Sequence, residues 1–464
     1  MVKIELTKGR RNIILVLFLF GLFIGSLDAG IIGPALQSIQ GTFNIDSRLS
    51  SWVYTTYVLF FIVGSPIVAK LSDFKGKRNI YILSIAIFAI GSGLIAFSHV
   101  FELVILGRAL QGFSAGGLFP LAAAFIGDYF PVEKRGTALG SLGSVYGMGA
   151  ICGPVLGAII LPFGWEWLFL INIPIAICLI LGSFLFIPIF EQNKEFNVDW
   201  LGIGLFSIAV SSLAFGLNRI DSSKFFESLF SFEVLPFILL FIILLPILFK
   251  IEKKSKEPLL PIELLKIKEM LVASCISLCF GMMVSIYVFL PSLALLIFFN
   301  DNSIASLIML PIVLTSTIAA PIVGILLDRL GSKKIMVTGT ISLLFGIIIM
   351  VFFFKIFYLF IFAEVFISFG LFTIVGAPIR YIVLTETKKG QRGSGQATVN
   401  ILSNVGQLIG GALIGAIIAS FSGKVIGYNI SFVFIFIFAI ISFLLAIQLK
   451  NRKEQLKTVE LNNR

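Results

Sequence analysis

Scarce residue types exclude several classes of protein before any motif is considered. Only 13% of the 464 residues are charged, whereas 58% are hydrophobic and the mean hydropathy is +1.06. A soluble chain of this length could not bury so much apolar surface. The chain also lacks a GxxxxGK[ST] loop, which would cradle the phosphates of ATP. We therefore expect an integral membrane protein that does not use ATP.

Histidine and cysteine are also few, which argues against an enzyme or a metal centre. The only histidine, His99, precedes the GFSAG string at 112–116, whereas the elbow of a serine hydrolase needs a later histidine. We therefore expect Ser114 to be a packing hydroxyl inside a helix. The four cysteines lie within apolar runs and predict neither a disulfide nor a metal site. No enzyme activity, cofactor or metal is expected.

Apolar runs of about 18 or more residues, long enough to cross ~30 Å of hydrocarbon, occur throughout the chain. We count fourteen such runs, and an even number places both termini on one side of the membrane. Their approximate spans are 12–34, 51–70, 79–98, 101–127, 137–161, 167–189, 200–217, 233–250, 270–299, 303–327, 335–354, 356–380, 394–420 and 429–449.

The positions of lysine and arginine support this count, because basic residues gather in cytoplasmic loops. With both termini in the cytoplasm, 28 of the 35 basic residues fall on the cytoplasmic side. The formal net charge of +11 is therefore expected to face the lipid bilayer rather than nucleic acid. We expect a multi-pass protein of the cell membrane.

A repeated loop sequence indicates that the chain consists of two related halves. AKLSDFKGKR begins at Ala69 and GILLDRLGSKK begins at Gly324, an offset of 255 residues. A second repeat pairs KRGTALG from Lys134 with QRGSGQA from Gln391. Eight helices separate each pair, so two six-helix halves with a two-helix insert fit the spacing. We predict halves at 1–189 and 269–464, with the insert and a cytoplasmic linker at 190–268.

Charged residues inside apolar runs are candidates for chemistry, because a buried charge seldom persists without a partner or an aqueous cavity. Asp28 precedes Pro34 by six residues and Arg108 follows Glu102 by six, so each lies ~9 Å below the outer end of its helix. This equal depth predicts that the two can pair, either as a static ion pair or as a proton-coupling pair. Glu364 is a second candidate carboxylate, or else a helix–helix hydrogen-bond partner.

The fifth apolar run carries regularly spaced small residues. Gly149, Gly153 and Gly157 recur every four residues, with Gly140 before them and Pro154 among them. Small residues at this spacing let two helices approach closely, and proline permits bending.

Four segments together resemble the major facilitator superfamily, and specifically its fourteen-helix drug:proton antiporters. They are the two loop repeats, LGRALQG from Leu106, the glycine–proline run from Gly140, and SLDAGIIGPALQSI from Ser26. WEWLFLINIPIAI from Trp165 also resembles the fourteen-helix group. The resemblance implies an all-α membrane protein with 14 transmembrane helices, in two six-helix bundles plus a two-helix central insert.

The resemblance also implies roles for particular residues. Asp28 and Arg108 would couple transport to protons, and the glycine–proline run would shape the contact between the halves. Glu364, from its place in an apolar run, is a further candidate for proton coupling or substrate binding. The cytoplasmic gate would include Asp73, Gly76, Lys77, Arg78, Asp128, Arg135, Asp328, Arg329 and Gly331. From the residues themselves, Gln111, Asn400, Asn404 and Gln407 are candidates for lining a substrate cavity, although the last three could instead bond neighbouring helices.

The implied function is proton-coupled efflux of lipophilic, cationic drugs by a monomeric antiporter that confers antibiotic resistance. A proton moving down one pH unit and 100 mV supplies roughly 3.7 kcal/mol, enough for about a several-hundred-fold solute gradient. Two alternatives remain open from the sequence. One is an exporter of a specific metabolite, lipid or peptide, and the other is a receptor of the same fold that no longer transports.

Overall fold

The computed structural model describes residues 7–45, 47–188, 200–220, 224–254, 262–298, 310–388, 391–421 and 424–463. Within them all regular structure is helical. The chain divides into two compact units. Unit 1 is Met1–Val198 with Lys389–Ala397, and unit 2 is Asp199–Lys388 with Thr398–Arg464. We describe each unit by itself.

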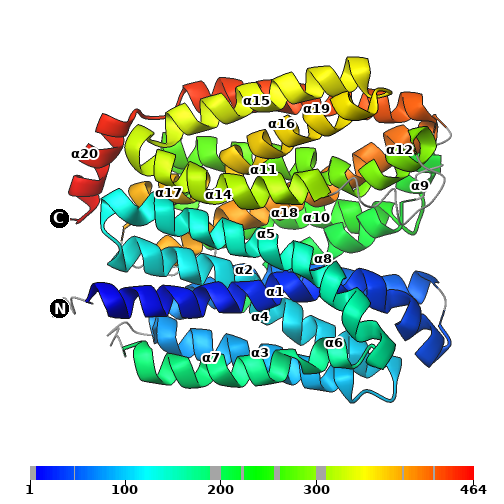
Figure 1. The fold of residues 1–464 in the computed structure, drawn as a ribbon, viewed down its shortest axis with the longest axis horizontal. Coiled ribbons are helices and arrows are strands. Elements are labelled where there is room, and N and C mark those ends of the chain that lie inside the picture. Colours follow the sequence, from blue (N-terminus) through cyan, green and yellow to red (C-terminus); the bar gives the residue numbers. More distant parts are fainter. Residues whose placement is uncertain are drawn as a thin grey trace. The chain divides into compact units, whose positions relative to one another are not determined.

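The described residues of unit 1 form seven α-helices and the start of an eighth. They are α1 (Lys8–Phe43), α2 (Ser47–Lys75), α3 (Lys77–Ala96), α4 (Phe101–Tyr129), α5 (Arg135–Ile160), α6 (Trp167–Leu170), α7 (Asn172–Phe186) and the start of α18 (Arg392–Ser420). The helix α4 packs against α1, α2, α3 and α5, and its second half is almost entirely buried (Figure 1). It therefore forms the centre of unit 1.

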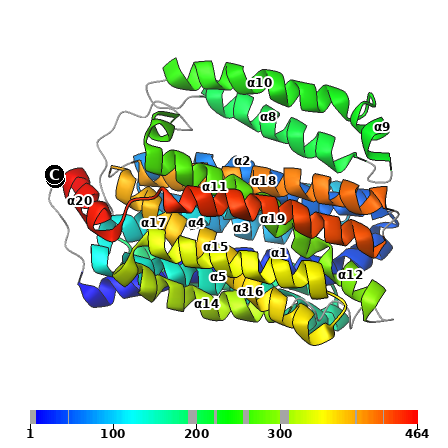
Figure 2. The ribbon, with the colours of Figure 1, turned by 90° about the horizontal axis from the view of Figure 1, so that it is seen from above.

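Unit 2 contains the rest of α18 and eleven other described helices. They are α8 (Trp200–Asn218), α9 (Phe225–Leu229), α10 (Leu235–Lys254), α11 (Lys268–Val284), α12 (Leu290–Ile297), α14 (Leu310–Leu330), α15 (Ser332–Phe353), α16 (Phe357–Val375), α17 (Ala377–Glu386), α19 (Val425–Ile447) and α20 (Arg452–Asn463). Figure 2 shows α8 and α10 side by side at one edge of unit 2. Two of the predicted runs are interrupted, at Ser285–Val288 and at Gly376, and Pro291 and Pro378 follow in the first turns of α12 and α17.

Twelve helices in the described part of the chain are long and apolar enough to cross a membrane. The prediction of fourteen spans is therefore not confirmed. The runs predicted at 137–161 and 200–217 do form helices, α5 and α8, but these two are not among the twelve. Part of the run predicted at 303–327, namely 303–309, lies outside the described residues.

Both copies of the repeated loop have the same backbone device. Gly76 has φ = 86° and Gly331 has φ = 82°, and each is the N-cap residue of the next helix. Residues with a side chain rarely adopt this left-handed region, so glycine is required at both turns. The repeat therefore encodes the same sharp helix–turn–helix connection in each unit.

After the last predicted span the chain forms a further helix, α20. It packs against α17, and Gln455 and Val459 on its inner face are buried. Gln455 exchanges hydrogen bonds with the backbone and hydroxyl of Ser332, and the Arg452 guanidinium donates to the Tyr381 hydroxyl. Figure 1 shows α20 across the end of the unit 2 bundle.

Candidate functional site

Close helix packing in unit 1 brings the guanidinium of Arg108 against α2. A Cβ on Gly112 of α4 would collide with the backbone of Tyr57, so only glycine allows this approach. Arg108 consequently donates from Nε to the Val53 carbonyl at 3.0 Å and lies 4.3 Å from the centroid of the Tyr57 ring. The side chain of Arg108 is completely buried.

Asp28 on α1 forms an ion pair with Arg108, as the equal depth of the two residues predicted. Arg108 Nη1 lies 2.5 Å from Asp28 Oδ2, and Asp28 is 1% exposed. Arg108 Nη1 also donates to Gln111 Oε1 at 2.9 Å. Arg108 therefore donates to three acceptors in unit 1, namely the Val53 carbonyl, the Asp28 carboxylate and the Gln111 side-chain oxygen.

Two neutral amides complete the environment of the Asp28 carboxylate. Gln111 Nε2 donates to Asp28 Oδ1 at 3.1 Å, and Asn172 Nδ2 of α7 donates to the same oxygen at 3.3 Å. Both amides also donate to the Ser92 hydroxyl of α3, at 2.8 and 3.3 Å. Asn172 Oδ1 has no hydrogen-bond partner among the described residues. Four helices thus converge on one buried carboxylate.

The helix α5 reaches α1 at the same level. A Cβ on Gly149 would collide with the Ser26 hydroxyl, and one on Gly153 would come within 2.7 Å of Gly30 Cα. These two glycines pack against α1 within unit 1, which is not the partner that we expected for the stripe. Gly140 and Gly157 are buried on the same helix, and the side chain of Pro154 lies outside the described part.

A second buried charge cluster surrounds Asp128, in the last turn of α4. Lys77 Nζ lies 2.7 Å from Asp128 Oδ2, and Arg392 Nη1 lies 2.7 Å from Asp128 Oδ1. Arg392 and Arg135 also donate to the Gly127 carbonyl, at 2.5 and 2.7 Å. Lys77, Arg135 and Arg392 are the first residues of α3, α5 and α18, so three helix starts converge on the end of α4. Cations are favoured beside the carbonyls of a helix C-terminus.

Asp73 lies beside this cluster, at the end of α2. Its carboxylate is 4% exposed, and a Cβ on Gly393 in the first turn of α18 would come within 3.1 Å of both its oxygens. The positive charge of Lys77 and the backbone N–H of Ser394 both interact favourably with this carboxylate. Arg78 takes no part in this cluster, because its guanidinium donates to the Phe184 carbonyl and stacks on the Phe184 ring of α7.

Unit 2 has several buried carboxylates, and the one predicted as a candidate site is Glu364 of α16. It is 0% exposed, and neither oxygen has a hydrogen-bond partner within the described chain. Tyr287 lies within electrostatic range of it, and Ser368 shares its helix face four residues on. Glu364 therefore makes no helix–helix hydrogen bond among the described residues, which was the alternative role considered for it.

The polar residues of α18 lie in the same unit. Asn400 accepts a hydrogen bond from Arg380 Nη2 at 3.1 Å, which ties α18 to α17. Asn404 and Gln407 follow at one-turn spacing, and Gln407 is exposed. In the second loop repeat Asp328 is half-buried, Arg329 is exposed, and Gly331 touches Arg452 of α20. The second loop therefore contacts the tail helix where the first loop contacts α4.

Comparison with protein families decides the broad identity. A model described as "Major Facilitator Superfamily" matches residues 18–301 and 272–462. The chain belongs to the major facilitator superfamily. Members of this superfamily are membrane transporters rather than enzymes, so the expected absence of enzyme activity follows from the family.

Several relatives of this transporter carry curated names. The chain is 31% identical over 396 residues to the uncharacterized MFS-type transporter YfiU of Bacillus subtilis, covering 84% of this chain and 76% of YfiU. It is 27% identical to Multidrug resistance protein 3 of B. subtilis, covering 72% of this chain and 64% of that protein. It is 29% identical to the riboflavin transporter RibZ of Clostridioides difficile, covering 71% and 72%.

Solved structures agree with the fold. The human organic anion transporter MFSD10 matches with a TM-score of 0.67 and 16% identity, over 94% of this chain and 99% of that one. At this identity the likeness shows the major facilitator fold alone.

Four residues of this transporter's two polar clusters were not singled out from the sequence. Ser92, Asn172 and Tyr57 are neutral residues in apolar runs, where hydroxyls and amides are too common to mark a site. Arg392 did carry a signal, because it occupies the position of Arg135 in the second sequence repeat. Gln111, expected to line a substrate cavity, is instead bonded to Asp28 and Arg108.

Proposed function

We propose that this transporter is a proton-coupled exporter of lipophilic cations that works by alternating access. The observation that carries the proposal is the buried Asp28 carboxylate, which is paired with Arg108 and held by two amides in the centre of unit 1. A buried charged group of this kind in a membrane span marks an ion or proton pathway more often than a structural feature.

The hydrogen bonds of Asp28 determine how the surrounding cluster must change when the carboxylate gains a proton. Asp28 Oδ2 faces Arg108, and Oδ1 faces the amide nitrogens of Gln111 and Asn172. A proton added to either oxygen would meet a donor instead of an acceptor, so protonation must rearrange the cluster. Rotation of the Asn172 amide would present its unpartnered Oδ1 to a protonated Asp28. Asn172 is therefore the residue that can accommodate both protonation states.

The Asp128 cluster is the proposed gate. Asp128, Lys77, Arg135, Arg392 and Asp73 join the ends of four unit 1 helices to the first turn of α18, whose remaining turns belong to unit 2. Movement of unit 2 would therefore strain or break the contacts of Arg392. We propose that this cluster stabilises the conformation that is open to one side of the membrane, until substrate or a proton binds or leaves.

The substrate class rests on the relatives and on a second carboxylate. Multidrug resistance protein 3 supports drug efflux, and a buried Glu364 suits a cationic substrate or a second proton. RibZ, named a riboflavin transporter, supports the alternative of a dedicated metabolite exporter. Tight selectivity with no competition among unrelated cations would distinguish that alternative.

We further propose that α5 and α8 also cross the membrane, which would give fourteen spans, and that both termini are cytoplasmic. The 26 residues of α5 exceed the length needed to span, and the 19 residues of α8 approach it. Residues 1–189 and 269–464 would then be the two six-helix halves and 190–268 the insert, in a monomer in the cell membrane.

Uptake into liposomes tests the proposed function. With an inside-acidic pH gradient, wild-type protein should accumulate ethidium, and Asp28→Asn protein should not, while remaining folded. Glu102→Gln, which changes an exposed carboxylate on the Arg108 helix, is the matched control and should transport like wild type. Gradient-driven accumulation by the Asp28→Asn protein would overturn the role of Asp28. Failure of wild type with every cation tried would favour the metabolite exporter.

A further inference from the structure

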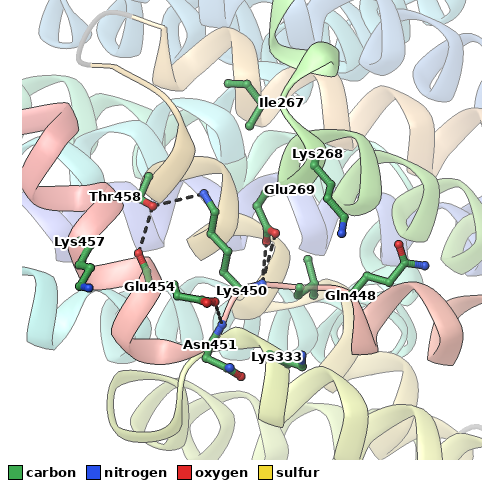
Figure 3. A pocket seen from close by; sticks show the side chains of 11 residues that line it. Ile267, Lys268, Glu269, Lys333, Gln448, Lys450, Asn451, Glu454, Lys457 and Thr458 are labelled. Atoms are coloured by element: carbon green, nitrogen blue, oxygen red, sulfur yellow. Dashed lines mark hydrogen bonds between the residues drawn. The ribbon is translucent and has the colours of Figure 1, made fainter.

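Unit 2 has a cavity of about 580 Å³ at the end where α20 docks (Figure 3). Its walls come from four segments: the start of α11, the start of α15, the link from α19 to α20, and one face of α20. The volume lies within the range of small-molecule sites. The lining residues that matter here are Lys268, Glu269, Lys333, Lys450, Glu454 and Lys457.

The carboxylates of this cavity already have partners. Both oxygens of Glu269 accept the Lys450 backbone N–H at 3.2 Å, and Glu454 accepts the Asn451 N–H at 2.8 Å. The ammonium of Lys450 is also used, because it donates to Glu386 at 2.7 Å. It also donates to Thr458 at 3.2 Å, a bond that Figure 3 shows. These contacts fix the shape of the cavity and bind α20 to α11 and α17.

Three lysines remain without an ion pair. In the described chain no carboxylate oxygen lies within 4 Å of the ammonium of Lys268, Lys333 or Lys457. They come from α11, α15 and α20 and line the same cavity. Glu269 and Glu454 keep their negative charges, since a neutral N–H does not cancel them, but the three unpaired lysines outnumber these two carboxylates and leave an excess of positive charge for an anion.

The cavity lies where membrane-spanning helices end. The spans Lys268–Ile297 and Ser332–Phe353 begin beside it, and the span Val425–Ile447 ends beside it. Exposed apolar side chains continue from the cavity along two of these helices. Leu271 lies one turn after Lys268, and Leu444 lies one turn before Gln448. A ligand with both an anionic group and hydrocarbon chains fits this arrangement better than a free ion.

We propose that this cavity binds the headgroup phosphate of an anionic phospholipid. Lys268, Lys333 and Lys457 hold the phosphate, and the acyl chains lie along Leu271 and Leu444. Basic pockets beside membrane-spanning helices bind anionic headgroups through this combination of charge and hydrocarbon contact. Because Lys457 belongs to α20, the bound lipid would also hold the tail helix on the bundle.

Lipid-dependent thermal stability tests the proposal. Purified full-length protein in detergent is titrated with phosphatidylglycerol, with phosphatidylcholine and, separately, with inorganic phosphate, and native mass spectrometry counts the retained lipid. We expect phosphatidylglycerol to raise the melting temperature and to stay bound. The triple variant K268Q/K333Q/K457Q should bind it at least about tenfold more weakly.

The matched control is K253Q/K254Q/K453Q, which removes the same charge from exposed lysines outside the cavity, one of them on α20. It should respond to phosphatidylglycerol like wild type. Should the triple variant unfold, K457Q alone provides the comparison. An equal response of the cavity variant and wild type would overturn the site. An equal response to inorganic phosphate or to phosphatidylcholine would overturn the anionic lipid as its ligand.

Discussion

Three hydrogen-bond donors point at the two oxygens of Asp28. A protonated Asp28 therefore needs an acceptor, and Asn172 is the residue that can supply one. Arg108 can only donate, and Gln111 already uses its oxygen to accept from Arg108. The Asn172 oxygen is the one that is left to accept a hydrogen bond from a protonated Asp28 after an amide rotation. Coupling should therefore depend on a residue that carries no charge.

Asn172→Leu is expected to lower gradient-driven transport by about tenfold or more while the protein stays folded. Leucine preserves volume but removes the group that accommodates both states of Asp28, and a hydrogen bond to a charged group contributes roughly 1.5–3 kcal/mol. Initial uptake rates over a range of pH measure the effect. Ser183→Ala on the same helix, where the hydroxyl bonds only to the Leu179 carbonyl, is the control. Unchanged coupling in Asn172→Leu would exclude this role.

Some of these residues could be predicted from sequence, and others could not, for a physical reason. A charge inside an apolar run is costly, so Asp28 and Arg108 were conspicuous and helix rise placed them at one depth. Ser92 and Asn172 cost little to bury once they are bonded, so nothing in the sequence distinguished them. The sequence suggested that Arg78 acts with Lys77 in the cytoplasmic gate. In the structure Lys77 pairs with Asp128, whereas the Arg78 guanidinium donates to the Phe184 carbonyl.

At the scale of elements, the contact between α1 and α5 sets the position of the Asp28 turn. Gly149→Ala adds a Cβ that would collide with the Ser26 hydroxyl, two residues before Asp28. We expect a loss of about 1–3 kcal/mol of stability from overpacking, together with slower transport. Thermal unfolding and uptake measure both. Gly41→Ala, at an α1 glycine with open space around it, should leave both unchanged. Normal transport in Gly149→Ala would show that α1 and α5 need not approach so closely.

The Asp128 cluster gives a second prediction at this scale. Asp128→Asn leaves Lys77 and Arg392 buried without their counter-charge, which should cost roughly 3–5 kcal/mol of stability in the state described. Melting temperature in detergent reports the loss. Glu233→Gln removes a largely exposed partner of Arg219 and should have little effect. Equal melting temperatures for the two variants would exclude a structural role for the cluster.

Helices could be predicted where the apolar runs were long. A helix was missed where most of its residues are polar. The repeated loop forms two helix–turn–helix connections, and the positive φ of Gly76 and Gly331 gives the physical reason for the repeated glycine, which was not predicted from the sequence. The helix α20 was missed because most of its residues are polar and only the inner face, with Gln455 and Val459, is buried.

On the whole-molecule scale, the chain is a major facilitator transporter in two units, and α18 takes part in both. The first turn of α18 is held by Asp128 and Gly127 in unit 1, while Asn400 on the same helix is held by Arg380 in unit 2. One continuous helix therefore connects the proposed gate to the second unit. The prediction of fourteen spans depended on run length, on the positions of the basic residues and on the family resemblance, and twelve helices long and apolar enough to span are found among the described residues.

Proton release on addition of substrate is the decisive test of proton coupling through Asp28. Liposomes with a pH-sensitive dye inside and equal pH on both sides receive external ethidium, so that only the cation gradient drives exchange. The interior is expected to become more alkaline with wild-type protein and to stay unchanged with Asp28→Asn protein. Proton movement of equal size in both proteins, or ethidium entry without any proton movement, would contradict proton coupling through Asp28.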